Sequence, residues 1–428
     1  MSGCFSSSWR ICDCDTRGLQ RESCLEFKMS RTLGYITPVR AFSSAGEIYM
    51  QAASGRVAEA LAKHFEKVCV CARVVHGPPP APFDAPLNAP NLELIAQPFW
   101  GTTAGSLIHL FGIARAYLRT CRRADVLFVR GGCPYTVVLY FCAAIFRKPI
   151  CHWVVSDPVT LLRTHTRRGS VVDTFALLYA LQDRLFTRLG RWVTNGTLIC
   201  NGSEVARAHA SPRTVEIVSS TIRDSEFFSR TDTCQGPVVR ILFVGFLRPE
   251  KGIEYLLDAV SQLKADVPWE LEIVGPRQFP DYCKKLDDIA AALGIRERIR
   301  WEGYLPNGKP LFDRMHAADL FVLPTLSEGT PHVLVEARAN GLPCISTTVG
   351  GVPTTVTDGY DALLVPPKNA RALARAMERV IGDGELRRAM ICNGLLAARK
   401  QTLDRFIAVV LRELNTNAPA ERAAVPQE

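Results

Sequence analysis

Two glutamates with seven residues between them, Glu328 and Glu336, lie in a segment whose residues predict a strand-to-helix turn. Thr330 suits the N-cap of a helix, and Pro331 suits its first position because proline needs no N–H donor there. We therefore expect Glu328 in the loop before the helix and Glu336 within the helix. A loop carboxylate can accept hydrogen bonds from sugar hydroxyls, and a helix carboxylate can reach a ribose diol. Taken alone, charge complementation of the helix N-terminus and a solvated helix face explain the pair equally well.

The expected helix begins where an apolar strand ends, and Gly341 and Pro343 stop it. A helix in that position exposes unpaired N–H groups and a partial positive charge toward the preceding loop. Phosphate or developing negative charge is held favourably at such a point. Gly329, Thr330 and Pro331 are therefore candidate ligand-binding residues.

A second turn of chemical interest runs from Gly245 to Gly252 and carries Arg248 and Lys251. Its glycines allow a phosphate to approach the backbone, and its two cations can neutralise a leaving nucleoside diphosphate. The turn does not have the G-x-x-x-x-G-K-[ST] pattern of a Walker phosphate loop. An ordinary basic surface turn is the alternative interpretation.

The frame SEGTPHVLVEARANGLPCI around the two glutamates resembles the E-x7-E signature of retaining GT-B glycosyltransferases (glycosyltransferase family 4, glycosyl transferases group 1). That family includes bacterial polysaccharide and glycolipid transferases. The resemblance extends to GGVP at 350–353, DG at 358–359, LLVPP at 363–367 and FVGFLRPEKG at 243–252. It covers nearly all of the chain from Val239 to about Asp383 with specific motifs, and over the first half it is mainly architectural.

The resemblance implies a reaction and a set of residue roles. A hexose would pass from a UDP- or GDP-sugar to a hydroxyl acceptor with retention of configuration, by a front-face route that needs no metal or other cofactor. Glu328 would position the donor sugar and Glu336 would bind the ribose. Lys251 and Arg248 would neutralise the diphosphate, and the acceptor would be a glycan or lipid-linked glycan.

The chain departs from the family pattern at two positions. Relatives often carry arginine where this chain has Phe246. Arg248, two residues further along the chain, would take the place of that arginine. Relatives commonly carry glutamate where this chain has Thr354, to which we attach no catalytic role. Gly275 and Tyr304 lie in loops that bracket the nucleotide base in similar enzymes, although a packed aromatic is the alternative for Tyr304.

Fewer residues indicate the acceptor side. The loop Pro38–Glu47 corresponds to one that lies under the donor phosphates in relatives, and only Gly46 in it matches well. Arg130 and Asp157 follow apparent strands whose ends face the same cleft. Turn chemistry beside Arg130 and helix capping by Asp157 explain these residues equally well. We interpret His152 as a packing histidine.

Short β-branched runs alternate with helix-period segments from about residue 33, which is typical of parallel-sheet α/β domains. The expected fold is GT-B, with two Rossmann-like doubly wound domains facing a central cleft. The expected ranges are a disordered or misannotated extension at 1–28, an acceptor-side domain at 29–225, a nucleotide-sugar-binding domain at 238–400, a helix crossing back to the first domain at 401–414, and a disordered tail at 415–428. A composition break at 223–237 predicts the linker.

The expected elements follow the same pattern in both halves. In the first half they are strand Leu33–Pro38, helix Glu47–His64, and strands Val68–Val75 and Asp125–Val129. In the second half the strands are Val239–Gly245, Leu271–Gly275, Leu320–Pro324 and Pro343–Thr347, and the helices are Ile253–Lys264, Pro280–Gly294 and Pro331–Gly341.

Composition narrows the class of protein further. The net charge of +9 comes from 51 basic and 42 acidic side chains without long basic runs, which favours an anionic substrate or membrane surface over nucleic acid. The 15 cysteines stand mostly singly in apolar stretches, as free thiols of a reducing cytosol do. Asp13 and Asp15 form a D-x-D pattern within the expected extension, and we expect no metal there.

The segment Arg163–Trp192 combines six arginines with Leu, Phe and Trp, and a helix of this composition could rest on an anionic membrane. A domain helix with snorkelling arginines is the alternative. The longest apolar run, Thr136–Phe146, is too short to span a bilayer. We therefore expect a cytoplasmic protein that can contact the inner face of the membrane. A sugar epimerase, a phosphorylase and a non-catalytic nucleotide-sugar-binding scaffold are the rival functions.

Overall fold

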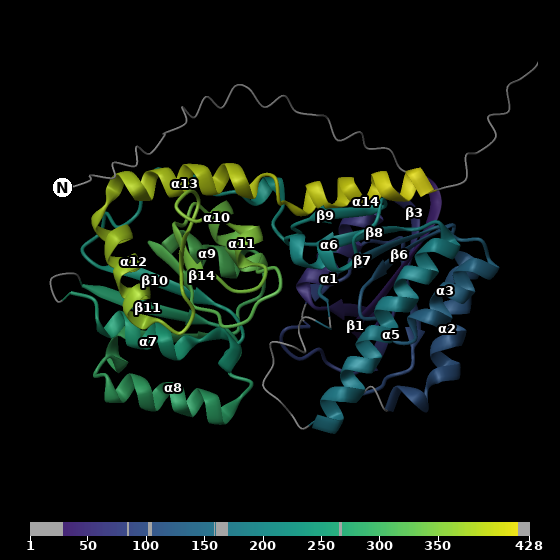
Figure 1. Cartoon of the computed structure of the whole chain (residues 1–428), viewed down its shortest axis with the longest axis horizontal. Coiled ribbons are helices and arrows are strands. Elements are labelled where there is room, and N and C mark those ends of the chain that lie inside the picture. The colour runs from purple at the N-terminus through teal and green to yellow at the C-terminus, as the bar shows by residue number, and fades with distance from the viewer. Residues whose placement is uncertain are drawn as a thin grey trace, which may run out of the picture. The chain divides into compact units, whose positions relative to one another are not determined.

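The computed structural model describes residues 29–83, 85–101, 105–157, 159, 170–264 and 268–417. Residue contacts divide the described residues into two units. One unit consists of residues 222–402, and the other consists of residues 29–221 together with the helix that begins at Leu403. Each unit is a mainly parallel β-sheet covered by helices (Figure 1). The predicted class, two doubly wound α/β domains, is confirmed. The extension 1–28 with its D-x-D pattern, and Arg163, Arg167 and Arg168, lie outside the described residues.

The sheet of the unit 222–402 has the strand order β12-β11-β10-β13-β14-β15, and its neighbouring strands pair in parallel. The strands are β10 (Val239–Val244), β11 (Trp269–Val274), β12 (Ile299–Gly303), β13 (Leu320–Leu323), β14 (Cys344–Thr347) and β15 (Leu363–Val365). The order reverses direction between β10 and β13. In open α/β sheets, ligands bind outside the carboxyl ends of the strands at such a switch point.

Helices lie on both sides of this sheet, and several of them begin or end beside Gly and Pro residues. They are α7 (Ile253–Ser261), α8 (Pro280–Ala292), α9 (Lys309–Ala317), α10 (His332–Ala339), α11 (Val352–Thr355), α12 (Ala370–Gly382) and α13 (Gly384–Ala398). The strands and helices expected in this half are present, with ends shifted by a few residues.

The unit 29–221 contains a parallel sheet in the order β5-β3-β1-β6-β7-β8-β9. Its strands are β1 (Met29–Ser44), β2 (Glu47–Met50), β3 (Phe65–His76), β4 (Ala85–Pro86), β5 (Leu92–Gln97), β6 (Val126–Arg130), β7 (Ile150–Val154), β8 (Thr197–Asn201) and β9 (Thr214–Ile217). Its helices are α1 (Ala52–Ala62), α2 (Leu110–Arg123), α3 (Thr136–Ile145), α5 (Ser170–Thr194), α6 (Ser203–Ala208) and α14 (Leu403–Asn417).

The start of this unit corrects two expectations. The predicted loop Pro38–Glu47 is mostly strand, because β1 continues to Ser44 and pairs with β3 as far as Ser43 and His76. The predicted helix Glu47–His64 begins instead as β2, which pairs antiparallel with β1. Ala45 and Gly46, with φ of 51° and 85°, form the two-residue turn between them. Two central residues with positive φ are typical of a tight hairpin, whose twist matches that of the strands.

Two apolar cores lie on opposite sides of the sheet in this unit. One contains α1 and α14, where Phe406 packs against Trp153 with ring centroids 4.6 Å apart. The other lies beneath α2 and α3. Figure 1 shows α2, α3 and α5 together on one side of the unit, with α14 along another. Among the described residues, no helix has the length and apolar character required to cross a bilayer.

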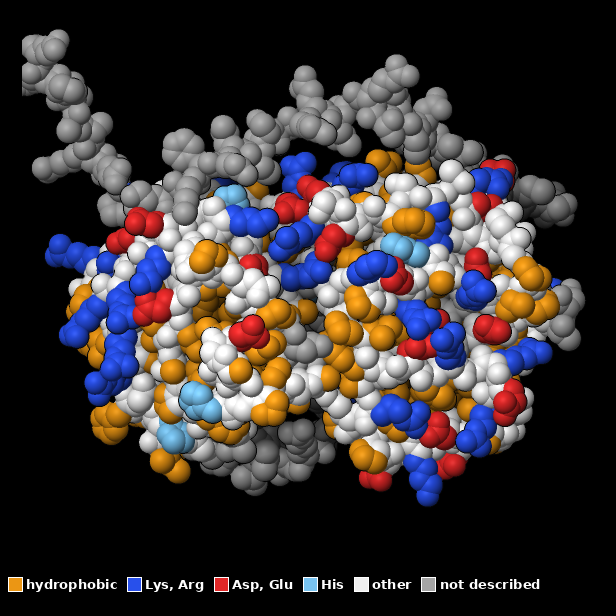
Figure 2. Space-filling model, turned by 180° about the vertical axis from the view of Figure 1, so that it is seen from behind, with side chains coloured by type: hydrophobic (Ala, Val, Ile, Leu, Met, Phe, Trp, Pro, Cys, Tyr) orange, Lys and Arg blue, Asp and Glu red, His pale blue; other side chains and the backbone are white. Residues whose placement is uncertain are grey.

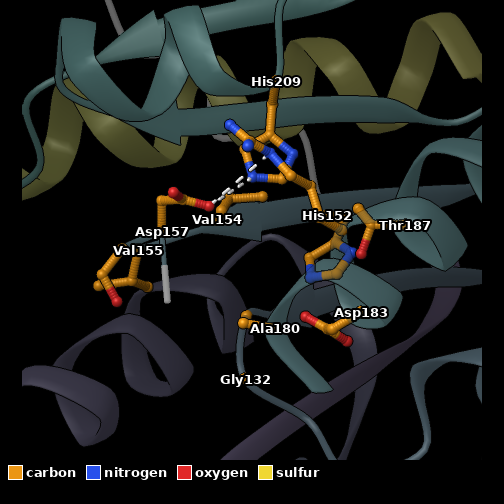
Figure 3. Close-up of a pocket in the computed structure, with 12 residues that line it drawn as sticks. Gly132, His152, Val154, Val155, Asp157, Ala180, Asp183, Thr187 and His209 are labelled. Atoms are coloured by element: carbon orange, nitrogen blue, oxygen red, sulfur yellow. Dashed lines mark ion pairs between the residues drawn. The ribbon is translucent and has the colours of Figure 1, made fainter. Parts of the chain in front are cut away.

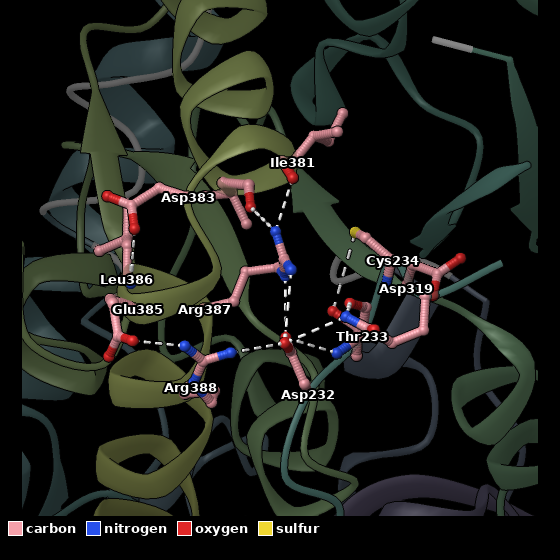
Figure 4. Close-up of polar contacts among 12 residues, drawn as sticks. Asp232, Thr233, Cys234, Asp319, Ile381, Asp383, Glu385, Leu386, Arg387 and Arg388 are labelled. Atoms are coloured by element: carbon pink, nitrogen blue, oxygen red, sulfur yellow. Dashed lines mark hydrogen bonds and ion pairs between the residues drawn. The ribbon is translucent and has the colours of Figure 1, made fainter. Parts of the chain in front are cut away.

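The segment interpreted as a linker, 223–237, is bonded to the unit 222–402 (Figure 4). Asp232 accepts hydrogen bonds from Arg387 Nε at 2.9 Å and from Arg388 Nη1 at 3.1 Å at the start of α13. The backbone N–H of Cys234 donates to Asp319 Oδ1 at 2.8 Å. The polar composition of this segment therefore reflects side-chain and backbone bonding to neighbouring elements. The cysteines of the described chain are free thiols, and only Cys234 and Cys392 among them are incompletely buried.

Candidate functional site

Lys251 and Glu328 meet at the switch point of the sheet in the unit 222–402. Lys251 ends the short helix Pro249–Lys251 after β10, and Glu328 lies in the loop after β13. Lys251 Nζ donates to Glu328 Oε2 at 2.5 Å, and the two side chains are only 20% and 15% exposed. The structure thus brings together two of the three predicted catalytic residues, which are 77 residues apart in the sequence.

The two loops that carry this ion pair are bonded to each other. The N–H of Leu326 donates to Glu250 O at 2.8 Å, and the hydroxyl of Thr325 lies 3.1 Å from the same oxygen. Thr325 Oγ1 also lies 3.4 Å from Glu328 Oε2. The Glu328 carboxylate is therefore held by side chains from two loops that are themselves bonded together at Glu250.

The ends of β10, β11 and β12 are aligned by the backbone of their loops. The N–H of Gly245 donates to Val274 O at 2.9 Å, and the N–H of Gly275 donates to Gly303 O at 2.7 Å. Gly275 has φ of +157°, and a Cβ there would lie 1.8 Å from Gly245 O. Only glycine allows this approach, so both predicted donor-side glycines belong to one layer of loops.

Gly351 forms a second close approach, beneath the loop of Glu328. Its N–H donates to Glu328 O at 3.2 Å, and a Cβ on Gly351 would lie 2.0 Å from Gly329 O. Gly329 itself is exposed. The predicted residues Glu328 and Gly329 are thus supported from below by the glycine pair of the GGVP motif.

Replacing Gly351 by alanine is expected to push the Glu328–Gly329 loop outward. The φ of Gly351, −83°, is open to alanine, so the steric contact alone should produce the effect. We expect a loss of about 1–3 kcal/mol in the free energy of unfolding, measured by urea titration. Gly382→Ala is the matched control, because its Cβ would meet no atom within 4 Å. Equal stability of Gly351→Ala and the wild type would contradict the prediction.

The helix α10 begins one residue later than predicted. Pro331, with φ of −78° and ψ of 95°, is its N-cap, and no side chain caps the helix, so the N-cap prediction for Thr330 is wrong. The extended ψ of Pro331 delays the first helical residue to His332. The predicted end is confirmed: the N–H of Leu342 donates to Ala337 O at 3.0 Å, and Gly341 has φ of +66°. The N-terminus without a side-chain cap opens toward the loop of Glu328, where an anion would be favoured.

Glu336 is 5% exposed and lies within α10, so the alternative of a solvated helix face is wrong. Its Oε1 accepts a hydrogen bond from Asn307 Nδ2 at 3.1 Å. Asn307 follows β12 in the same loop as the half-buried Tyr304. Sequence reasoning missed Asn307, although its position after a parallel strand could have identified it.

Arg248 is exposed and lies beside two aromatic rings. Its guanidinium carbon is 4.7 Å from the centre of the Phe246 ring and 5.5 Å from that of Phe279. Such cation–π contacts hold a guanidinium without neutralising it. Phe246, which departs from the family pattern, therefore supports the arginine that follows it.

The acceptor-side candidates lie in the unit 29–221 and are not all together. Gly46 is at the exposed tip of the β1–β2 hairpin. Arg130 ends β6, donates to the hydroxyl of Ser54, and stacks 5.2 Å from the Trp153 ring centre. Asp157 is buried after β7, at the carboxyl end of the sheet.

Asp157 lines a pocket of about 70 Å³ between β7, α5 and the end of α6 (Figure 3). Its Oδ1 lies 3.6 Å from His209 Nε2 and 3.9 Å from Arg184 Nε. His209 is buried, and neither of its ring nitrogens has a hydrogen-bond partner among the described residues. Asp183 also faces the pocket, and burial raises the pKa of its carboxyl. Sequence reasoning missed His209 and Asp183, which no motif marks.

His152 lies in the same pocket wall and is buried, with its Nδ1 2.9 Å from Tyr140 Oη. Burial, assisted by the nearby His209, lowers the pKa of His152 to about 3. Between about pH 6.5 and pH 3 the unfolded chain therefore binds a proton at this residue that the folded chain does not. The imidazole stays neutral in the folded protein at ordinary pH, as a packing histidine would.

Stability is consequently expected to fall as the pH is lowered from 7 to 5, and His152→Asn should reduce that fall. Urea titrations at the two pH values give the free energies of unfolding. His76→Asn, at an exposed histidine, is the control and should leave the pH dependence unchanged. The same pH dependence in His152→Asn and the wild type would contradict this assignment.

Part of the chain is similar in sequence to known glycosyltransferases. Residues 234–396 match the family model described as glycosyl transferases group 1. An uncharacterized glycosyltransferase of Methanocaldococcus jannaschii, MJ1607, is 31% identical over 179 residues, which are 42% of this chain and 44% of the relative. D-inositol 3-phosphate glycosyltransferase of Geodermatophilus obscurus is 29% identical over 235 residues, 53% of this chain and 52% of the relative. The chain thus spans about half the length of the curated relatives it matches.

A solved structure of Anabaena Alr3699/HepE in complex with UDP aligns with a TM-score of 0.65 at 17% identity, covering 91% of this chain and all of that one. This likeness concerns the fold. Residues 234–396 are therefore similar to the glycosyl transferases group 1 family, and the chain, with its two parallel-sheet units, has the GT-B fold.

Proposed function

We propose that this protein transfers a hexose from a UDP- or GDP-sugar to a hydroxyl group of an acceptor, with retention of anomeric configuration. The observation that carries the proposal is the ion pair of Lys251 and Glu328 at the switch point between β10 and β13. A diphosphate needs a cation at that position, and a bound sugar needs a hydrogen-bond acceptor beside it.

In this proposal the ion pair opens when the donor binds. The diphosphate takes the ammonium group of Lys251, and the exposed Arg248 adds a second positive charge from its aromatic support. Glu328 is then released to accept hydrogen bonds from the donor sugar and to stabilise an oxocarbenium-like state. The N-terminus of α10 favours the phosphate, and these groups act in place of a metal ion.

The remaining donor contacts come from the neighbouring loops. Buried Glu336 binds the ribose diol, with Asn307 holding one of its oxygens. Gly245, Gly275 and Tyr304 surround the base. The leaving phosphate oxygen removes the proton of the acceptor hydroxyl on the same face from which it departs, so no protein nucleophile is required.

The acceptor is proposed to be a glycan or a lipid-linked glycan, bound in the unit 29–221. The pocket of Asp157 and His209 supports this, because a sugar hydroxyl both donates and accepts hydrogen bonds and the pocket offers both kinds of group. The protein would act in polysaccharide or glycolipid synthesis in the cytoplasm, and a peripheral contact with an anionic membrane would bring a lipid-linked acceptor to it.

Thermal unfolding with a panel of UDP-, GDP- and ADP-sugars tests the proposal. A true donor stabilises the folded chain by mass action, by about 2.7 kcal/mol at a hundredfold excess over its dissociation constant. Release of nucleoside diphosphate that depends on an added glycan would then support transfer. No stabilisation by any nucleotide sugar would overturn the proposal, whereas stabilisation with phosphate-dependent turnover would identify a phosphorylase.

A further inference from the structure

The helix α5 exposes the side that is usually buried. Its apolar side chains recur every three or four residues on the outer face: Leu178, Leu181, Leu185, Leu189 and Trp192, each 45–80% exposed. The inner face carries small or polar residues, and Gly190 packs so closely on the Tyr140 ring that a Cβ would lie 2.2 Å from it. A helix in a water-soluble domain normally has the reverse arrangement.

Two neighbouring helices continue this pattern. On α3, Val137, Phe141 and Ile145 are exposed at intervals of four residues. On the segment that enters α2, Ile108 and Phe111 are 84% and 87% exposed. The same helical face continues through the exposed residues Arg115, Arg119 and Arg122.

The three helices are adjacent in space. α3 contacts both α2 and α5, and Figure 1 shows the three side by side on one side of the unit 29–221. We call their outward surface the α2–α3–α5 face. Hydrophobic side chains reach the surface at many places on the side seen in Figure 2, so exposure alone would identify nothing. Their helical periodicity on three adjacent helices sets this face apart.

Among the described side chains, the charges on the α2–α3–α5 face have one sign. The sequences of α2 and α3 contain no Asp or Glu. Among the described side chains of α5 the one acidic residue is Asp183, which points into the pocket and accepts a hydrogen bond from Thr136. Arg188 is exposed on α5, beside Leu185 and Leu189. An apolar surface whose described charged side chains are arginines matches a partner that is apolar inside and negatively charged outside.

We propose that the α2–α3–α5 face docks this protein on an anionic lipid bilayer. Phe111, Phe141 and Trp192 enter the boundary between headgroups and acyl chains, and the arginines contact lipid phosphates. A protein partner or a second copy of the chain would have to supply acidic groups at the positions facing three arginines of α2. The docking does not depend on sugar transfer, although it would present a lipid-linked acceptor to the proposed enzyme.

Co-sedimentation with vesicles tests this docking. The full chain should bind vesicles of phosphatidylglycerol mixed with phosphatidylcholine, bind phosphatidylcholine alone much more weakly, and lose affinity as salt is raised. The triple variant Phe111→Ser, Phe141→Ser, Trp192→Ser should bind at least about ten times more weakly, because it removes the inserted apolar groups. The variant Arg115→Glu, Arg119→Glu, Arg122→Glu should lose about 100-fold.

The charge-matched control is Arg296→Glu, Arg371→Glu, Arg375→Glu, at exposed arginines of the other unit. It should retain most of the binding. Absence of vesicle binding, equal binding to neutral vesicles, or equal loss in the control would overturn the proposal. So would a dimer in sedimentation equilibrium that the serine variant dissociates while vesicle binding is unaffected. Nucleotide-sugar protection, measured on each variant, reports separately on folding and on the proposed function.

Discussion

Lys251→Ala is expected to lower turnover of the nucleotide sugar by about 10²- to 10³-fold and to remove most of its protection against thermal unfolding. The ammonium group lies 2.5 Å from Glu328, at the strand ends where the diphosphate is proposed to bind. A preorganised donor aimed at developing negative charge contributes this much to a reaction in a site shielded from water. Its loss also leaves the partly buried Glu328 carboxylate without its cation, which further disfavours a diphosphate nearby.

Two further variants separate charge from structure. Glu328→Gln should also abolish turnover, yet it should keep or increase protection by UDP, because the amide no longer competes for the ammonium group. Lys284→Ala, at an exposed lysine of α8, should behave as the wild type. Turnover of Lys251→Ala within a few-fold of the wild type would exclude the proposed role of Lys251, as would full nucleotide protection in that variant.

The second half of the chain could be predicted closely because local and tertiary signals agree there. The residues of β13 are all buried, and a continuous apolar run of that length that ends at a proline, here Pro324, is typical of a central parallel strand. The positions of Lys251 and Glu328 follow from the same rule, since parallel strands place their following loops along one edge. The prediction for the start of the first half was wrong because Glu47–Met50 forms a strand that pairs with the strand before it. Helical periodicity in the sequence cannot reveal that pairing.

The parts of the site that could not be predicted depend on contacts distant in sequence. His209 reaches Asp157 only because α6 and the loop after β7 follow neighbouring parallel strands, β8 and β7. Thr330 has the right chemistry for an N-cap, but Pro331 adopts an extended ψ and takes that position. The conformation of a single loop residue is determined by the path of the surrounding backbone. The intrinsic conformational preference of that residue has only a weak influence on this path.

Arg338→Met is expected to give the largest loss of stability in the unit 222–402. Arg338 is fully buried in α10 and pairs with Asp361, which is also buried. Its Nη2 donates to Thr355 O at 3.0 Å and to Gln401 Oε1 at 2.6 Å, and its Nε donates to Leu334 O at 3.1 Å. Methionine fills much of the volume but leaves a buried carboxylate without its cation. Breaking a buried pair in this way costs about 3–5 kcal/mol.

Urea titration of the full chain measures this loss as a lower midpoint for the transition of that unit. The double variant Arg338→Met, Asp361→Asn should recover part of the stability, because no unpaired charge remains buried. Arg371→Met, at an exposed arginine of α12, should change the free energy of unfolding by no more than about 0.5 kcal/mol. An unshifted midpoint in Arg338→Met would mean that the ion pair does not hold α10. A double variant less stable than Arg338→Met would mean that packing around the pair, and not its charge, is what stabilises the helix carrying Glu336.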